Sequence, residues 1–217
     1  ELKGLVQVLA PTSKNYGTSR VELQEPGNMK FSLYQKTLDE LGVEIFQGDY
    51  MGYNDSEDRI RYYNIPWVPY SVVDGVLYDA AGDLTELKSQ MESRWDTTSP
   101  VKLNVASKIL GDSLEVTLTM VVYGAVTQEN LKLQTVITES MLTYPSPPGS
   151  NGEAEFPHVF RKFIGGVNGI DITNLNIGDS LTYVVKDEID SDWNRDEIEI
   201  IAFLQANSSK EVVQAAT

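Results

Sequence analysis

The sequence predicts an α/β domain followed by an all-β sandwich domain, and three observations support this prediction. In the first half of the chain, short apolar runs alternate with amphipathic segments of helical period. In the second half, apolar and polar side chains alternate from one residue to the next, as in strands with one buried face. A polar stretch that ends in a proline, residues 96–100, separates the two patterns. We therefore expect one domain over residues 1–97 and a second over residues 98–217.

The expected order of elements in the first domain is β-α-β-α-β-β-α. The strands are short apolar runs, and two helices begin at acidic or capping residues, Asp55 and Asp83. The pair Asp74-Gly75 between apolar runs is the strongest short-range signal for a β-hairpin. This order, with a hairpin near its end, is the thioredoxin arrangement. In chain order the elements are strand 5–10, helix 29–41, strand 43–46, helix 55–63, strands 70–73 and 76–78, and a helix that begins at residue 83.

The second domain is predicted to be an immunoglobulin-like β-sandwich. Five apolar side chains share one face of segment 113–123, and the period of two recurs over residues 131–137 and 198–204. Several alternating strands in succession are typical of a sandwich, because each sheet buries one face against the other. The proline-rich stretch 144–152 is expected to be irregular. The five apolar side chains are Leu114, Val116, Leu118, Met120 and Val122.

The composition argues against several kinds of partner. Of the 217 residues, 32 are acidic and 17 are basic, which gives a formal net charge of −15 at pH 7. Nucleic acids and anionic membrane surfaces bind proteins through Lys and Arg, so we expect neither as a partner. We interpret the acidity mainly as a source of solubility, with a bound cation or a basic partner as the alternative. No run approaches the roughly 20 apolar residues of a membrane-spanning helix, so we predict no transmembrane segment.

The chain has no cysteine and a single histidine, His158. The absence of cysteine rules out disulfides, thiolate metal sites and thiol–disulfide exchange. With one imidazole, histidine-rich metal sites and most hydrolytic triads lack a member. We interpret His158 as a packed or hydrogen-bonded structural residue, with general-base catalysis as the alternative. Arg161 is expected to hold an acidic loop of its own protein.

Segment 62–75 resembles the thioredoxin-fold signature, in which a tyrosine-bearing helix leads to a Val-Pro pair and then to a hairpin. The resemblance implies a cis peptide bond at Pro69 and, beside it, a groove in which extended peptides bind. Ser13 and Tyr16 stand where such enzymes carry their two cysteines. A serine hydroxyl is not ionised near neutral pH and forms no disulfide, so we predict a redox-inactive domain. The predicted groove residues are Ser13, Tyr16, Trp67, Val68, Pro69 and Tyr70.

Five motifs follow one another in the second half of the chain. They are Asn-Gly-Glu at 151–153, Phe-Pro-His-Val-Phe-Arg-Lys at 156–162, Trp-Asn at 193–194, Ile-Ala-Phe-Leu-Gln at 201–205 and Glu-Val-Val-Gln-Ala-Ala at 211–216. In order and spacing these motifs resemble the outer membrane protein 28-related family, whose members pair a thioredoxin-like domain with a C-terminal β-domain. The resemblance implies an exported protein that is associated with the cell envelope or surface.

Oxygen-bearing side chains at alternate positions, Asp190, Asp192 and Asn194, resemble the start of a calcium-binding loop. However, Arg195 stands where such a loop needs glycine, and Ile201 stands where it needs an acidic residue. We therefore interpret these side chains as turn formers, with Ca²⁺ as the alternative, and we predict no other cofactor.

The aromatic side chains around the expected cis-proline lead to the main functional hypothesis. Aromatic rings with polar tips are typical of binding surfaces, although they also fill ordinary domain cores. We expect a non-catalytic extracytoplasmic protein that binds a protein, peptide or glycan partner or has a structural role. The aromatic side chains are Tyr50, Tyr53, Tyr62, Tyr63, Trp67 and Tyr70.

The alternative is a hydrolase or lectin-like enzyme whose acidic side chains meet at the interface of the two domains. Paired carboxylates perform acid–base catalysis when they are held at a suitable separation. Asp49 and Asp55 are the candidates, although helix capping also accounts for the acidic cluster around them. A third hypothesis is a purely structural component of the cell surface, which would need neither a catalytic pair nor a binding surface.

Overall fold

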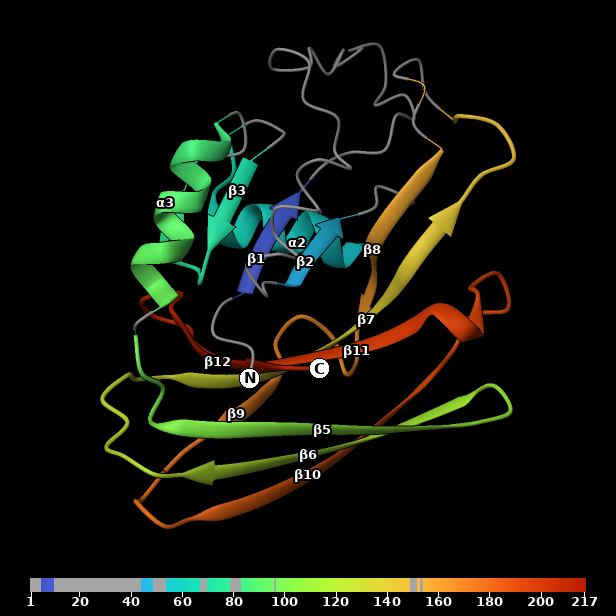
Figure 1. Ribbon diagram of the computed structural model, residues 1–217. Helices are drawn as coiled ribbons and strands as arrows, with labels where there is room; N and C mark the ends of the chain where they lie inside the picture. Colours follow the sequence, from blue (N-terminus) through green and yellow to red (C-terminus); the bar gives the residue numbers. More distant parts are fainter. Residues whose placement is uncertain are drawn as a thin grey trace.

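The computed structural model in Figure 1 contains two β-sheets and two α-helices within the residues that it describes. These residues are 5–9, 44–48, 54–66, 70–78, 83–95, 97–148, 152 and 154–217. The helix expected over residues 29–41 lies outside the described residues, and so do the predicted groove residues Ser13, Tyr16, Trp67, Val68 and Pro69.

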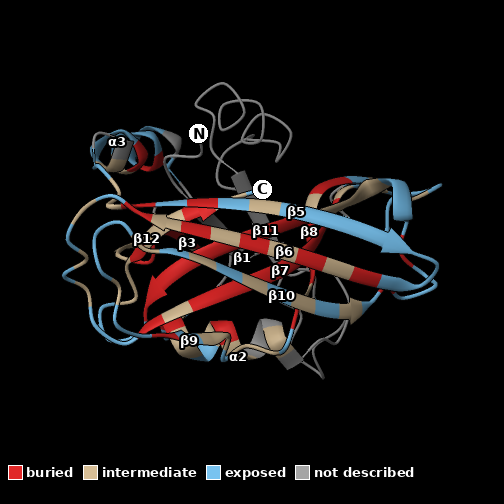
Figure 2. Ribbon diagram, turned by 90° about the horizontal axis from the view of Figure 1, so that it is seen from below, coloured by how far each residue is buried: buried red, intermediate tan, exposed pale blue. Residues whose placement is uncertain are grey.

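The smaller sheet has three antiparallel strands in the order β10-β6-β5. β5 (Val101–Leu110) and β6 (Ser113–Val122) form a long hairpin, and β10 (Ser180–Glu188) pairs with the other edge of β6. The alternation predicted for β6 is confirmed, because the five apolar side chains predicted to share one face are all buried, at most 1% exposed, whereas the residues between them are only partly buried. In Figure 2 the strand accordingly changes colour from one residue to the next.

The larger sheet runs in the order β12-β11-β7-β8-β2-β1-β3-β4, with β9 paired to the start of β7. β7 pairs antiparallel with β8 and β11, whereas β2 pairs in parallel with β8 and with β1. The pairing of β2 with β8 therefore joins the N-terminal strands to the C-terminal ones in one sheet. The bounds are β1 Leu5–Leu9, β2 Glu44–Gly48, β3 Tyr70–Val73, β4 Leu77–Tyr78, β7 Leu131–Thr143, β8 Glu155–Phe163, β9 Ile170–Ile172, β11 Ile198–Ala206 and β12 Val212–Ala216.

The helices of the described residues are α2 (Asn54–Tyr63) and α3 (Leu84–Trp95), together with a short 3-10 turn, η1 (Arg195–Glu197). In Figure 1 both helices lie with β1 and β3 on one side of β11 and β12, and the smaller sheet lies on the other side. The large sheet thus has two differently covered faces.

α3 begins as its sequence predicts. The carboxylate of Asp83 accepts hydrogen bonds from the backbone N–H groups of Thr85 at 2.9 Å and Glu86 at 3.1 Å, which caps the first turn. Leu87 and Met91, one turn apart, are buried against the molecule. The predicted hairpin at Asp74-Gly75 is also present, because β3 and β4 pair antiparallel on either side of that turn.

The main hydrophobic core lies between the two sheets, where Leu118 and Met120 of β6 pack with Leu133 and Ile137 of β7 and Leu204 of β11. A smaller cluster covers the opposite face of the large sheet, and it includes three phenylalanines. β7 and β11 are therefore buried on both faces for most of their length, although their alternation predicted one solvated face. The three phenylalanines are Phe160, Phe163 and Phe203.

The expectation of a separate thioredoxin-like α/β domain is wrong. Most described elements are strands in largely antiparallel sheets, and α2 and α3 have only 10 and 12 residues. The described N-terminal strands do not form a sheet of their own, because β2 pairs with the edge of β8. The order of short elements along the chain was a good guide to local structure but a poor guide to which strand edges pair. The expected boundary between residues 97 and 98 remains a prediction.

Candidate functional site

Four tyrosines form a contiguous cluster between the last turn of α2 and the β3–β4 hairpin. The ring centroids of Tyr62 and Tyr63 are 4.9 Å apart, and those of Tyr63 and Tyr78 are 6.4 Å apart. Tyr70 continues the chain of contacts, with its ring centroid 6.4 Å from that of Tyr78. Tyr63 is buried, whereas the other three side chains are partly exposed. We call Tyr62, Tyr63, Tyr70 and Tyr78 the tyrosine cluster.

Two cations lie on this cluster and come from distant parts of the chain. The guanidinium carbon of Arg59 is 4.5 Å from the ring centroid of Tyr62 and 4.7 Å from that of Tyr63. The ammonium of Lys210, in the loop before β12, is 5.5 Å and 5.8 Å from the same two centroids. All four distances fall within the range of cation–π attraction, so both cations lie over the negative faces of these two rings.

Hydrogen bonds fix Arg59 and the ring of Tyr63 to the large sheet. Arg59 Nη2 donates to the hydroxyl oxygen of Tyr63 at 2.7 Å and to Gln205 Oε1 at 3.0 Å. Gln205 Nε2 in turn donates to the Tyr63 hydroxyl at 2.7 Å and to the carbonyl of Lys210 at 2.6 Å. Gln205 of β11 therefore links helix α2 to the loop that carries Lys210.

The hydroxyls of Tyr62 and Tyr78 stay protonated at neutral pH. Burial, together with the neighbouring Tyr63, raises the pKa of Tyr62 to about 12, although Arg59 opposes the rise. Burial and the same neighbour also raise the pKa of Tyr78. Neutral phenols donate hydrogen bonds, and the Tyr78 hydroxyl donates one to the carbonyl of Gly75 at 2.8 Å.

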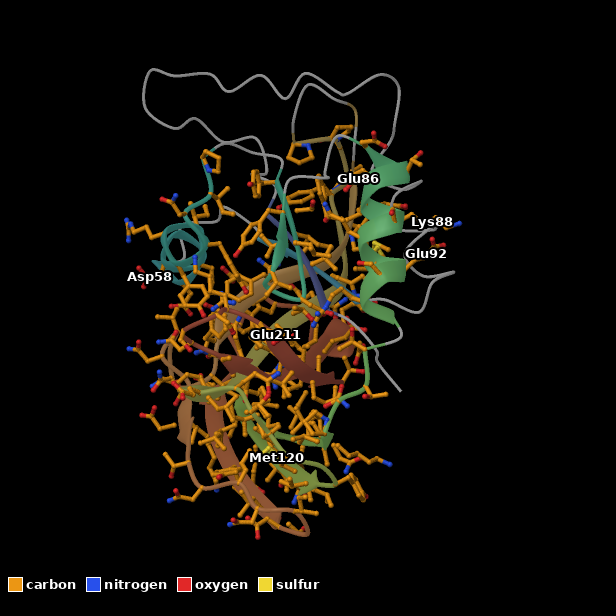
Figure 3. All side chains as sticks on the ribbon, turned by 90° about the vertical axis from the view of Figure 1, so that its left-hand side faces the viewer. Asp58, Glu86, Lys88, Glu92, Met120 and Glu211 are labelled. Carbon is orange, nitrogen blue, oxygen red and sulfur yellow. The ribbon has the colours of Figure 1, made fainter. Side chains whose placement is uncertain are left out.

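A second polar network, beside the cluster, holds the β3–β4 hairpin and α3 against the loop before β12. Arg94 of α3 bonds Asp74 at 3.0 Å and Glu211 at 2.8 Å, and the backbone N–H of Val212 donates to the carbonyl of Asp74 at 2.8 Å. Burial disfavours the charged form of Glu211, yet the bonds from Arg94 and Gln128 outweigh it and lower its pKa. Figure 3 shows Glu211 at the level where the helical part meets the sheets.

Arg161 contacts the loop that carries Trp193 and Asn194, partly through a buried carboxylate. Its guanidinium pairs with Glu139 of β7, and both side chains are at most 4% exposed. Glu139 also accepts the backbone N–H of Asn194 at 2.5 Å, which anchors the loop. The guanidinium carbon of Arg161 lies 6.0 Å from the ring centroid of the buried Trp193. Two separate sequence motifs, at 156–162 and 193–194, thus contact each other in the structure.

His158 has a carboxylate neighbour that its sequence context does not show. Its Nδ1 lies 2.9 Å from Glu199 Oε2 on β11, and the backbone of His158 has a φ of +49°, which is uncommon for a residue inside a strand. A hydrogen-bonded, partly buried histidine fits the structural interpretation that we favour.

The calcium candidates are used as local caps. Asp190 Oδ1 accepts the N–H of Asp192 at 3.0 Å, and Asn194 Oδ1 accepts that of Asp196 at 3.2 Å. The side chain of Arg195 bonds Asp112 and the carbonyl of Gly111 in the β5–β6 turn. Across the part of the chain that the structure describes, no three acidic or histidine side chains gather as metal ligands.

Of the predicted groove residues, Tyr70 is the one within the described part of the chain, and it belongs to the tyrosine cluster. Asp49 lies outside the described residues, whereas a carboxylate oxygen of Asp55 accepts the backbone N–H of Phe163 at 2.9 Å. Sequence analysis did not find Arg59 or Lys210 as part of the site. Arg59 is one turn before Tyr62 and Tyr63, a spacing that could have indicated it, but nothing local indicates Lys210.

Fold and site together define a β-rich protein in which two helices and a hairpin are held against one face of a β-sandwich. Within the described residues, no helix combines the length and the apolar character that a membrane crossing requires.

Comparison with known proteins places the chain in a family. A model of the family described as Outer membrane protein Omp28 matches residues 57–217, and the chain belongs to this family. It is an extracytoplasmic protein associated with the cell envelope. The matched range includes both cations and all four members of the tyrosine cluster. None of the curated proteins matches the sequence.

Two solved structures share the fold at low sequence identity, with TM-scores above 0.5. HBP35 of Porphyromonas gingivalis is similar over 100% of this chain and 75% of its own, with a TM-score of 0.73 and 15% identity. A protein of Agrobacterium tumefaciens is similar over 99% of this chain and 93% of its own, with a TM-score of 0.55 and 16% identity. A domain of the outer membrane lipoprotein Omp28 from Porphyromonas gingivalis aligns with 56% of this chain and 89% of its own, with a TM-score of 0.40 and 16% identity.

Proposed function

We propose that this envelope protein is a non-catalytic binding protein and that the tyrosine cluster is its contact surface for an extended partner, a peptide or a glycan. The observation that carries the proposal is the partial exposure of Tyr62, Tyr70 and Tyr78 in a cluster that α2 and the β3–β4 hairpin build, with Lys210 from a third segment beside it. Tyrosine is enriched at protein interfaces, because one ring provides a large apolar contact and a polar tip.

The surroundings of the cluster support a binding role. Its base is rigid, because Tyr63 is buried and its hydroxyl accepts two hydrogen bonds from Arg59 and Gln205. A contact surface held in place before the partner arrives loses less side-chain entropy on binding. The rings above this base are less buried and are therefore within reach of a partner.

The enzymatic alternative has weaker support. Asp55, one of its two candidate carboxylates, accepts a backbone hydrogen bond from Phe163 of β8, which is a structural role. The acidic side chain of Glu139 is likewise occupied by Arg161 and by the N–H of Asn194. We therefore propose no catalytic residue.

The proposal is tested by a thermal-shift screen of peptides and oligosaccharides, followed by titration of the best ligand into two variants. A ligand at 100 times its dissociation constant stabilises the folded state by about 2.7 kcal/mol. We expect Tyr62→Ala to weaken binding by about tenfold or more, and Tyr123→Ala to leave it unchanged. Tyr123 is 66% exposed and follows β6 in the sandwich, so it serves as the matched control. Equal affinity of the two variants would show that the cluster is not the contact surface.

A further inference from the structure

Arg59 and Lys210 are cations that have no carboxylate partner among the described residues of this strongly acidic protein. The formal net charge is −15, and many described basic side chains are paired, among them Arg61, Lys88, Arg94, Lys132, Arg161, Lys162, Lys186 and Arg195. Neither Arg59 nor Lys210 forms an ion pair with a residue of the described part of the chain. No carboxylate in the described part of the chain therefore neutralises the positive charge of these two cations by direct contact.

The carboxylates near Lys210 are committed to another cation. Glu211 is the next residue, but its Oε1 accepts from Arg94 and its Oε2 accepts from Gln128 at 3.2 Å. Asp74, beside the same loop, also bonds Arg94. These two carboxylates therefore bond Arg94 rather than Lys210 in the described contacts.

Arg59 is buried, at 3% exposure, and its Nε has no hydrogen-bond partner. A buried cation is costly unless it is paired, and here neutral groups, the Tyr63 hydroxyl and the Gln205 amide, together with the surrounding rings, take the place of a carboxylate. Its charge is thus fixed beneath the rings and adds to the positive potential at the partly exposed Lys210.

Donors as well as charge are available at this position. Lys210 carries three N–H donors, and the hydroxyl of Tyr62, a partly exposed residue, makes no hydrogen bond with the described residues. Since this hydroxyl stays protonated at neutral pH, it can donate to an acceptor. A carboxylate accepts hydrogen bonds from both kinds of donor, and charge-assisted bonds of this type are the stronger ones.

We propose that Lys210 and Tyr62 bind a carboxylate side chain of an acidic peptide segment, with Arg59 fixed beneath them as a supporting charge. This inference rests on the proposed contact surface and adds the chemistry of its partner. A peptide is favoured over a glycan, because the cations occupy positions over the rings of Tyr62 and Tyr63 where a sugar would stack. A glutamate or aspartate needs no free ring face, only the ammonium and the hydroxyl.

The test is a titration of the full chain with three labelled probes at low salt. The first is a short peptide of alternating glutamate and glycine, the second is the same peptide with glutamine in place of glutamate, and the third is an oligogalacturonate. We expect the glutamate peptide to bind at least about tenfold more tightly than the glutamine peptide, because one charge-assisted hydrogen bond has about that effect. Its affinity should fall as salt is raised, because salt screens partly exposed charges.

The variants locate the effect. We expect Lys210→Gln to weaken binding of the glutamate peptide by about tenfold and Tyr62→Phe to weaken it by about threefold. Both variants should bind the glutamine peptide with the same, lower affinity as the parent protein. Lys102→Gln is the matched control, since Lys102 is an exposed lysine on β5 of the smaller sheet. Melting temperatures equal to that of the parent protein confirm that each variant is folded.

The outcomes separate this inference from the proposed function. Equal binding of the glutamate and glutamine peptides, both lost in Tyr62→Ala, would overturn the carboxylate site and leave the contact surface standing. Tighter binding of the oligogalacturonate than of the glutamate peptide would overturn the choice of a peptide. An equal loss in Lys210→Gln and Lys102→Gln would assign the effect to overall charge and overturn the site. Absence of binding by every probe would overturn the carboxylate inference, whereas the wider screen tests the contact surface itself.

Discussion

The two faces of the large sheet are held by different kinds of interaction. On one face, β7 and β11 pack against the smaller sheet through a continuous layer of aliphatic side chains. On the other face, α2 and α3 are also fixed by polar contacts between distant residues, such as Arg94 with Glu211 and Arg59 with Gln205, 117 and 146 positions apart. The β3–β4 hairpin, at the end of the same sheet, joins these contacts through Asp74. Apolar packing is non-directional, whereas hydrogen bonds specify position. The polar face is accordingly where the candidate site is built.

The largest expected effect lies in the aliphatic layer. Leu118 of β6 is fully buried in the core between the sheets, so Leu118→Ala should lower the free energy of unfolding by about 4 kcal/mol through lost burial and a cavity. Urea denaturation measures this change. Thr117→Val on the opposite face of the same strand is the control, with an expected change below about 0.5 kcal/mol. A loss below about 1 kcal/mol for Leu118→Ala would show that the layer is not closely packed.

The next effect lies in the contact between the hairpin and the loop before β12. Gly75 has a φ of +77°, and a Cβ there would lie 1.8 Å from the carbonyl oxygen of Lys210. We expect Gly75→Ala to cost about 3 kcal/mol, since backbone strain and a clash with backbone add together.

Gly111→Ala provides the matched control for that prediction. Gly111 has a φ of +60° in the β5–β6 turn, and a Cβ there would meet nothing within 4 Å. The same substitution should therefore cost only the backbone strain, about 1 kcal/mol. Equal losses for the two variants in urea denaturation would contradict a close approach of the hairpin to Lys210.

The smallest effect depends on pH. Glu211 has a lowered pKa in the folded protein, so its contribution to stability is present above the pKa of the unfolded chain and is lost as pH falls through the folded value. Glu211→Gln should therefore cost about 1 kcal/mol at pH 7. The difference in the free energy of unfolding from the parent protein should shrink as pH falls below about 4.3, the pKa of a glutamate in an unfolded chain, and vanish below the lowered pKa of the folded protein. Thermal unfolding between these pH values measures the change.

Lys88→Gln is the control for this prediction, because Lys88 and Glu92 form an exposed pair on α3 with a separation of 3.8 Å. This substitution should change the free energy of unfolding by less than about 0.5 kcal/mol. In Figure 3 both side chains lie on the outer side of α3, away from Glu211. If the free energies of unfolding of Glu211→Gln and the parent protein differed by the same amount from pH 7 to pH 3, the charge of Glu211 would not stabilise the contact between α3 and the loop before β12.

The same contrast explains which features the sequence predicts. The period of two in β6, the cap at Asp83 and the hairpin turn at Asp74-Gly75 are local signals, and the structure has all three. The pairing of β2 with β8 is not local, because its partners Gln47 and Val159 lie 112 positions apart in the sequence. The prediction of a thioredoxin-like domain therefore used correct local elements, but it assumed the wrong pairing of their strands.

The candidate site shows the same limit. A concentration of tyrosines predicted an aromatic surface, and Tyr62, Tyr63 and Tyr70 do lie together. Lys210 joins them only because β11 and β12 bring its loop back to α2, through Gln205. Long-range contacts of this kind leave no periodic signal in one sequence, so the charge of the site could not be predicted.

The most direct test of the site is an NMR titration, in which the glutamate peptide is added to protein whose tyrosines are isotope-labelled. Each of the 11 tyrosines gives its own signal, which a Tyr→Phe variant assigns. We expect the signals of Tyr62 and Tyr70 to shift as the peptide is added, and those of Tyr123 and Tyr183 in the sandwich to stay unchanged. Shifts confined to Tyr123 or Tyr183, or no shift at any tyrosine at saturating peptide, would contradict the assignment of the tyrosine cluster as the contact surface for an acidic peptide.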